Sequence, residues 1–160
     1  MQFSPVTPDS VKHTQLSLFE AFIAPPAAFQ KAPEEVWPLQ APEVFSELSL
    51  RGATGSCLGL LAPMLRELSD GEHMRWLTLI APPTSLTQSW LREAGLNRER
   101  ILLLQPRASQ TPHQLACEAL RLGNSHTVVS WVNPLSSMGR QQLVAAARQG
   151  DAQSLNIRLG

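Results

Sequence analysis

Short apolar runs alternate with helix-patterned segments from residue 44 onward, and this alternation restricts the fold more than any other feature of the sequence. The runs at 76–81 and 127–132 are continuous rather than alternating in polarity. Continuous runs are typical of parallel strands that are covered by helices on both faces. Strands separated by helices predict a three-layer α/β domain, in which helices cover both faces of a mainly parallel, twisted sheet. The five predicted strands are Val44–Leu50, Arg75–Ala81, Arg100–Leu104, Thr127–Val132 and Leu155–Leu159.

The segments between these strands carry the start and stop signals of helices. Ser85 and Thr111 each stand three residues before a glutamine, which is the spacing of a capping box. Ser137–Gln149 is rich in alanine. Ser56–Leu68 has leucines at helical spacing, although Pro63 should kink that helix or delay its start. Three of the helices are followed by a glycine that can end them, namely Gly95, Gly123 and Gly150.

The first 43 residues have a different composition, which predicts a flexible arm. They contain 7 of the 13 prolines, and their apolar residues follow no sustained period. Such a segment offers little apolar surface to a packed core. We therefore expect a Pro-rich arm over residues 1–43 and a single α/β domain over residues 44–160.

The charge distribution argues against a dedicated nucleic-acid binder. The formal net charge is +0, and charged residues make up 16% of the chain, against about 25% in typical soluble domains. The charges are unevenly placed, because from Asn97 onward seven arginines face only three acidic residues. A charge-poor surface with a basic last third is compatible with a protein partner.

The cysteines and the hydropathy pattern indicate the cytoplasm. Cys57 and Cys117 are far apart in the sequence and have no metal-ligand spacing, which is typical of buried thiols in a reducing compartment. The sequence has no run of 18 apolar residues and no signal-peptide pattern. We therefore expect no contact with a membrane and no bound metal.

The loop after the first predicted strand is where a nucleotide would bind in a fold of this class. Residues 51–57 lack the requirements of a phosphate-binding loop, because Ser56 replaces its lysine and Cys57 replaces the hydroxyl that holds magnesium. No two histidines stand at metal-ligand spacing, and no pair of carboxylates stands out. The sequence predicts neither a cofactor nor a catalytic centre, so we do not expect an enzyme.

Aromatic and basic residues instead suggest a binding surface. Arg75 and Trp76 open the second predicted strand, Trp90 lies in the next helix, and Arg98 and Arg100 flank the start of the third strand. Tryptophan and arginine are the residue types most enriched at interface hot spots. Trp90 also has the helical spacing of a core residue, and both interpretations stay open. We expect the C-terminal ends of the strands and the neighbouring helix to bring Arg75, Trp90 and Arg100 together.

Several segments, in this order, resemble the SulA family of bacterial cell division inhibitors. They are residues 75–82 (RWLTLIAP), 86–96 (LTQSWLREAGL), 119–124 (ALRLGN) with 128–131 (VVSW), and 143–147 (LVAAA) before Gly150. The similarity extends over residues 45–158 and implies a RecA-like fold without a nucleotide site, in agreement with the altered loop.

The resemblance also implies a function. The family is made in the SOS response to DNA damage and stops septation by binding FtsZ, the tubulin-like division protein. It covers the synergy-loop face of FtsZ, which the next monomer needs for polymerisation and for GTP hydrolysis. The positions important for inhibition fall on Arg75, Ile80, Trp90 and Arg100, and the family can carry lysine at the last of these.

Some alternatives stay open at this point. A RecA-like accessory protein of DNA-damage mutagenesis shares the expected fold and regulation, whereas an NTP-dependent enzyme would need a phosphate site. The pattern leaves open whether the free protein forms a homodimer. It also leaves open turnover by the Lon protease, because the residues up to Gly160 include little or none of the tail through which relatives are recognised.

Overall fold

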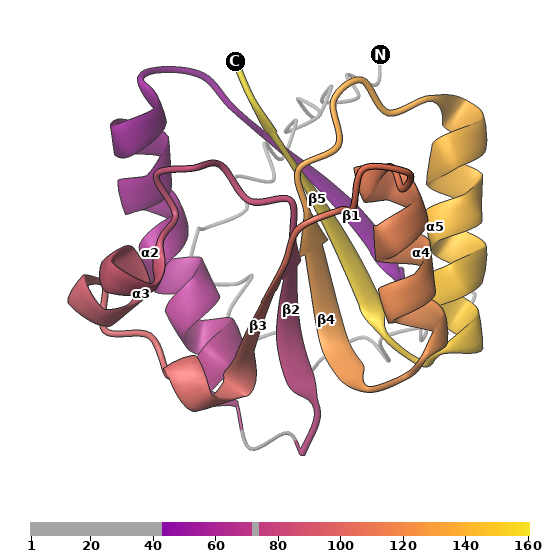
Figure 1. The fold of residues 1–160 in the computed structure, drawn as a ribbon, viewed down its shortest axis with the longest axis horizontal. Coiled ribbons are helices and arrows are strands. Elements are labelled where there is room, and N and C mark those ends of the chain that lie inside the picture. The colour runs from indigo at the N-terminus through magenta and orange to yellow at the C-terminus, as the bar shows by residue number, and fades with distance from the viewer. Residues whose placement is uncertain (1–42, 72–73) are drawn as a thin grey trace, which may run out of the picture. The chain divides into compact units, whose positions relative to one another are not determined.

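The computed structural model describes residues 43–71 and 74–160, and their fold is a five-stranded parallel sheet between two layers of helices (Figure 1). Apart from Glu43, the predicted arm lies outside the described residues. The predicted α/β class and its three layers are confirmed. The strands are β1 (Phe45–Leu50), β2 (Trp76–Ile80), β3 (Ile101–Leu104), β4 (Ser125–Ser130) and β5 (Gln153–Leu159).

The strand order is β1-β5-β4-β2-β3, and every neighbouring pair is parallel. All five predicted strands are present, but β4 ends at Ser130 and not at Val132. The buried side chain of Asn156 explains this end, because it accepts the N–H of Val132 at 2.9 Å and donates to the carbonyl of Val132 at 3.0 Å. At Val132, the Asn156 side chain thus forms the hydrogen bonds that a neighbouring strand would otherwise form with the backbone.

Helices α2 and α3 cover one face of the sheet, and α4 and α5 cover the other (Figure 1). Each face has its own cluster of buried aliphatic side chains. Within the described part of the chain, no helix has the length and apolar character needed to cross a bilayer. The helices are α2 (Thr54–Asp70), α3 (Gln88–Glu93), α4 (Pro112–Arg121) and α5 (Ser137–Gln149), and a 3₁₀ turn, η1 (Arg98–Arg100), precedes β3.

The helix signals were predictive with two exceptions. The capping box of α4 is present, since the Thr111 hydroxyl accepts the N–H of Gln114 and the Gln114 side chain accepts the N–H of Thr111. The cap of α3 is Thr87 and not Ser85, because the Thr87 hydroxyl accepts the N–H of Trp90 at 3.1 Å. Pro63 does not delay α2, which begins at Thr54. Pro63 is exposed, so water can reach the carbonyl that its ring leaves without a donor.

Candidate partner-binding surface

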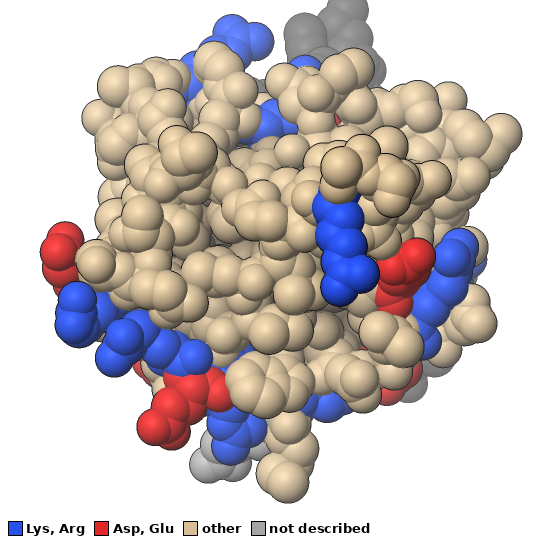
Figure 2. All heavy atoms as spheres, in the orientation of Figure 1, with Lys and Arg blue, Asp and Glu red and all other residues tan. Residues whose placement is uncertain are grey.

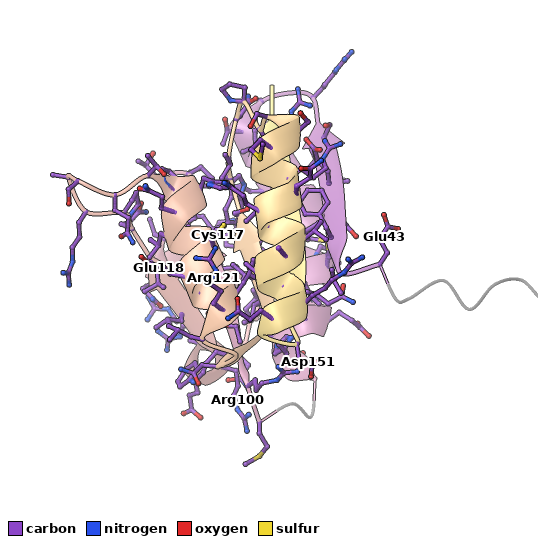
Figure 3. The ribbon with its side chains drawn as sticks, turned by 90° about the vertical axis from the view of Figure 1, so that its right-hand side faces the viewer. Glu43, Arg100, Cys117, Glu118, Arg121 and Asp151 are labelled. Carbon is purple, nitrogen blue, oxygen red and sulfur yellow. The ribbon has the colours of Figure 1, made fainter. Side chains whose placement is uncertain are left out.

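Two of the predicted binding residues lie together at the amino-terminal ends of neighbouring strands. Arg75 directly precedes β2, and Arg100 directly precedes β3. Because Leu77 pairs with Ile101 in the parallel register, the preceding residues Trp76 and Arg100 lie side by side. Figure 3 shows Arg100 at the same end of the molecule as Asp151, which precedes β5. The expectation that the C-terminal ends of the strands bring Arg75 and Arg100 together is therefore wrong, because both residues come before the first residue of their strand.

Ile80 is not part of an exposed surface. Its side chain is 0% exposed and packs with the cluster of apolar residues beneath α4 and α5. β2 lies between β3 and β4, so both of its edges are occupied. The prediction that Ile80 contacts a partner needs correction, because its side chain cannot reach one without unfolding of the sheet.

Arg75 binds the carboxyl-terminal end of α5. One guanidinium nitrogen donates to the carbonyl of Asp151 at 2.6 Å and to that of Gly150 at 3.4 Å. The other lies 3.7 Å from the Asp151 carboxylate. A cation at this position also interacts favourably with the helix dipole. Arg75 therefore joins the start of β2 to the turn between α5 and β5.

We expect Arg75→Ala to lower the free energy of unfolding by about 1–2 kcal/mol, because two backbone carbonyls lose a charged donor. Asp151→Asn should change it by less than about 0.5 kcal/mol, since an exposed ion pair contributes little and asparagine tolerates the positive φ of this position. Urea unfolding of both variants measures the difference. Equal losses of unfolding free energy in the two variants would mean that Arg75 stabilises this turn through the Asp151 carboxylate and not through the backbone carbonyls.

Trp90 has a mixed environment. It is partly buried and packs against the cluster that α2 and α3 form with their face of the sheet. Its neighbour Leu91 is 0% exposed and forms the core side of α3. The core interpretation of Trp90 is thus confirmed in part, and its exposed remainder lies in the helix layer rather than at the strand ends.

An exposed apolar surface lies beside these arginines, and its two leucines, Leu102 and Leu122, were not predicted from the sequence. Trp76 is 42% exposed, Leu102 41% and Leu122, at the end of α4, 70%. Trp76 and Leu102 point to the same sheet face, because Leu102 pairs with Thr78, two residues after Trp76. The N–H of Trp76 donates to the carbonyl of Asn124 at 3.0 Å, which brings this strand end close to the end of α4. We call Trp76, Arg100, Leu102 and Leu122 the β3-edge surface.

Figure 2 looks at the molecule from the side of β3. The surface over this strand, between α3 and α4, is uncharged, and charged side chains lie at its lower left and right borders. Charged residues are depleted at the centre of protein-binding surfaces and more frequent at their rim. In the sequence, this surface is indicated by the uncharged run ILLL of β3. That run does not show which of its leucines is exposed.

A second feature, an open polar groove of about 710 Å³, lies along α4 and includes Arg107, His113, Cys117 and Arg121. Figure 3 shows Cys117 and Arg121 on this helix. His113 Nε2 lies 3.0 Å from the carbonyl of Gly139 and must donate to it, so it cannot accept a proton from Cys117 Sγ, 3.8 Å away. In residues 43–71 and 74–160, no three His, Cys, Asp or Glu side chains form a group that could hold a metal ion.

Burial raises the pKa of the Cys117 thiol above its ordinary value, an effect that nearby Arg121 opposes. We expect alkylation of Cys117 by iodoacetamide at pH 8 to be slower in the folded protein than in urea, as followed by mass spectrometry. Because the pKa of this thiol is higher in the folded chain, its contribution to the free energy of unfolding is fully present below its ordinary pKa of 9.0. That contribution is lost as the pH rises through the folded pKa. Equal alkylation rates in both states would contradict the burial.

Comparison with known proteins identifies the family. The family model described as "Cell division inhibitor SulA" matches residues 44–154. A cell division inhibitor SulA from Pseudomonas aeruginosa is 66% identical over 122 residues, 76% of this chain and 76% of that protein. The SulA of Photorhabdus laumondii is 34% identical over 93 residues, 58% of this chain and 51% of its own length.

A solved structure agrees with these matches. The crystal structure of SulA from Pseudomonas aeruginosa is 67% identical in sequence and has a TM-score of 0.71, covering 74% of this chain and 100% of that one. The residues matched by the family model include β1 to β4 and all of α2 to α5. The chain therefore belongs to the SulA family of cell division inhibitors.

Proposed function

We propose that this chain is a cytoplasmic cell division inhibitor, made in the SOS response, that binds FtsZ on its synergy-loop face. Membership of the SulA family supports inhibition of cell division, and the motif resemblance supports FtsZ as the partner. An inhibitor bound there occupies the surface that the next FtsZ monomer needs to join the filament and to complete GTP hydrolysis. The chain acts by occupying this surface, and it requires neither catalysis nor a cofactor.

The observation that carries the proposal is the exposed Trp76 beside Arg100. The register of β2 and β3 places these two residues at one corner of the sheet, with exposed Leu102 two residues further along β3. An indole that is already accessible loses its remaining water on binding, and an arginine beside it can pair with a carboxylate. These are the residue types that dominate the affinity of protein interfaces.

Purified FtsZ with GTP and magnesium tests the proposal directly. We expect light scattering by the polymer and phosphate release to fall together as the chain is added, in proportion to its ratio to FtsZ. This dependence follows because each bound inhibitor removes one monomer from assembly. Unchanged scattering with an equimolar amount of folded chain would reject the proposal. It would favour an accessory role in mutagenesis, which leaves FtsZ polymers intact.

A further inference from the structure

Among residues 43–71 and 74–160, β3 is the last strand on its side of the sheet, so part of its backbone faces away from the other strands. The carbonyl of Leu104 accepts the N–H of Ala81 at 2.9 Å, which directs Leu104 toward β2. Along a strand of a parallel sheet, every second residue forms its backbone hydrogen bonds with the same neighbouring strand. Leu102 and Leu104 therefore bond to β2, and the backbone of Leu103 faces away from β2. The N–H and C=O groups of Leu103 are therefore directed toward the open edge.

The two edges of this sheet are built differently. β1, at the opposite edge, contains Glu47, whose carboxylate pairs with Arg140 of α5 and with Arg158 of β5. A charged residue inside an edge strand is a common defence against pairing with another chain. β3 reads ILLL and has no charged residue among its four positions. An edge without this defence is suited to accept a further strand.

The charge around β3 specifies what that strand should contain. Residues 98–107 hold three arginines and one glutamate, a net charge of +2. Arg98 lies just before β3 and Arg107 just after it, and both are exposed. A second copy of this chain would place the same arginines against each other, whereas an acidic segment would be attracted.

We propose that the β3 edge accepts an extended, acidic segment of the partner as a sixth strand. The inference rests on the proposed function and makes that segment part of FtsZ. Backbone hydrogen bonds to Leu103 provide the register of the added strand. Apolar side chains on its inner face pack on Trp76 and Leu102, and its carboxylates lie near Arg98 and Arg107.

Hydrogen exchange of the full chain, read at single amides by mass spectrometry with and without FtsZ, tests the proposal. We expect FtsZ to slow exchange of the Leu103 and Gln105 amides, which face the open edge, about tenfold or more. Inhibition of FtsZ with unchanged exchange at these amides would overturn the strand addition and leave the proposed function intact. A parent chain that does not inhibit FtsZ would overturn both. If exchange at these amides slows in the chain without FtsZ as the concentration of the chain rises, a second copy of the chain is the occupant. That result would also reject the inference.

Two substitutions at one exposed position separate charge from apolar contact. Leu102→Glu places a carboxylate against the acidic segment, and we expect inhibition to weaken about fivefold or more. Leu102→Lys removes the same apolar contact but preserves the attraction, so its loss should be smaller. Met138→Glu, on the 63% exposed residue of α5, serves as the control and should inhibit like the parent. Equal losses for glutamate and lysine would contradict an acidic partner segment.

Discussion

Gly150→Ala is expected to destabilise the domain by about 3 kcal/mol or more, through steric conflict rather than backbone strain. A Cβ atom on Gly150 would lie 1.7 Å from the carbonyl oxygen of Leu120 and 2.8 Å from its carbon. That carbonyl accepts the N–H of Gly123 at 3.2 Å, so the end of α4 cannot shift without breaking its own cap. The ends of α4 and α5 must therefore separate, and the contact of Arg75 with Gly150 is lost as well.

Gly59→Ala is the matched control and should have the opposite effect. Gly59 lies inside α2, is exposed, and has no heavy atom within 4 Å of the position of a Cβ. Alanine is preferred to glycine in a helix by about 1 kcal/mol, so this variant should unfold at a higher temperature than the parent. Thermal unfolding compares the two. A melting temperature of Gly150→Ala equal to that of the parent would show that α4 and α5 do not meet as closely as described.

The architecture was predictable from local patterns, whereas the strand order was not. The apolar runs marked each strand because parallel strands are buried on both faces, and Thr111 with Gln114 marked α4 because both halves of a capping box are short-range contacts. The order β1-β5-β4-β2-β3 depends on how the helices pack across the sheet. The end of β4 depends on Asn156, which is 26 residues after Ser130 and was not recognisable as its partner.

The exposed residues of the candidate surface were predictable in type and only partly in position. Arg100 and Trp76 are exposed together, but the continuous run that contains Trp76 and Ile80 does not show which end is covered. Which residue of β2 is exposed depends on helix α4. This helix packs over Ile80, whereas Trp76 lies near the last turn of α4. The contact of Arg75 with the end of α5 spans 75 residues and leaves no trace in a local pattern.

Trp76→Ala is expected to weaken inhibition of FtsZ about 30-fold, which corresponds to roughly 2 kcal/mol of binding energy at a hot spot. Trp76 is 42% exposed in the free chain, so its loss should lower the melting temperature only slightly. Arg100→Ala, which removes the neighbouring cation, should weaken inhibition at least about tenfold, or about 1.4 kcal/mol. Light scattering by FtsZ polymers measures both, with the amount of inhibitor corrected for its folded fraction.

Two substitutions in the interior distinguish loss of contact from loss of folding. Ile80→Ala removes a fully buried side chain and should cost about 2–5 kcal/mol of folding free energy, while each molecule that remains folded still inhibits like the parent. Trp90→Ala should also destabilise the domain, because the partly buried Trp90 packs against the apolar cluster on that face of the sheet. If Trp76→Ala inhibits like the parent while folded Trp90→Ala does not, the contact surface lies on α3 rather than at the β3 edge.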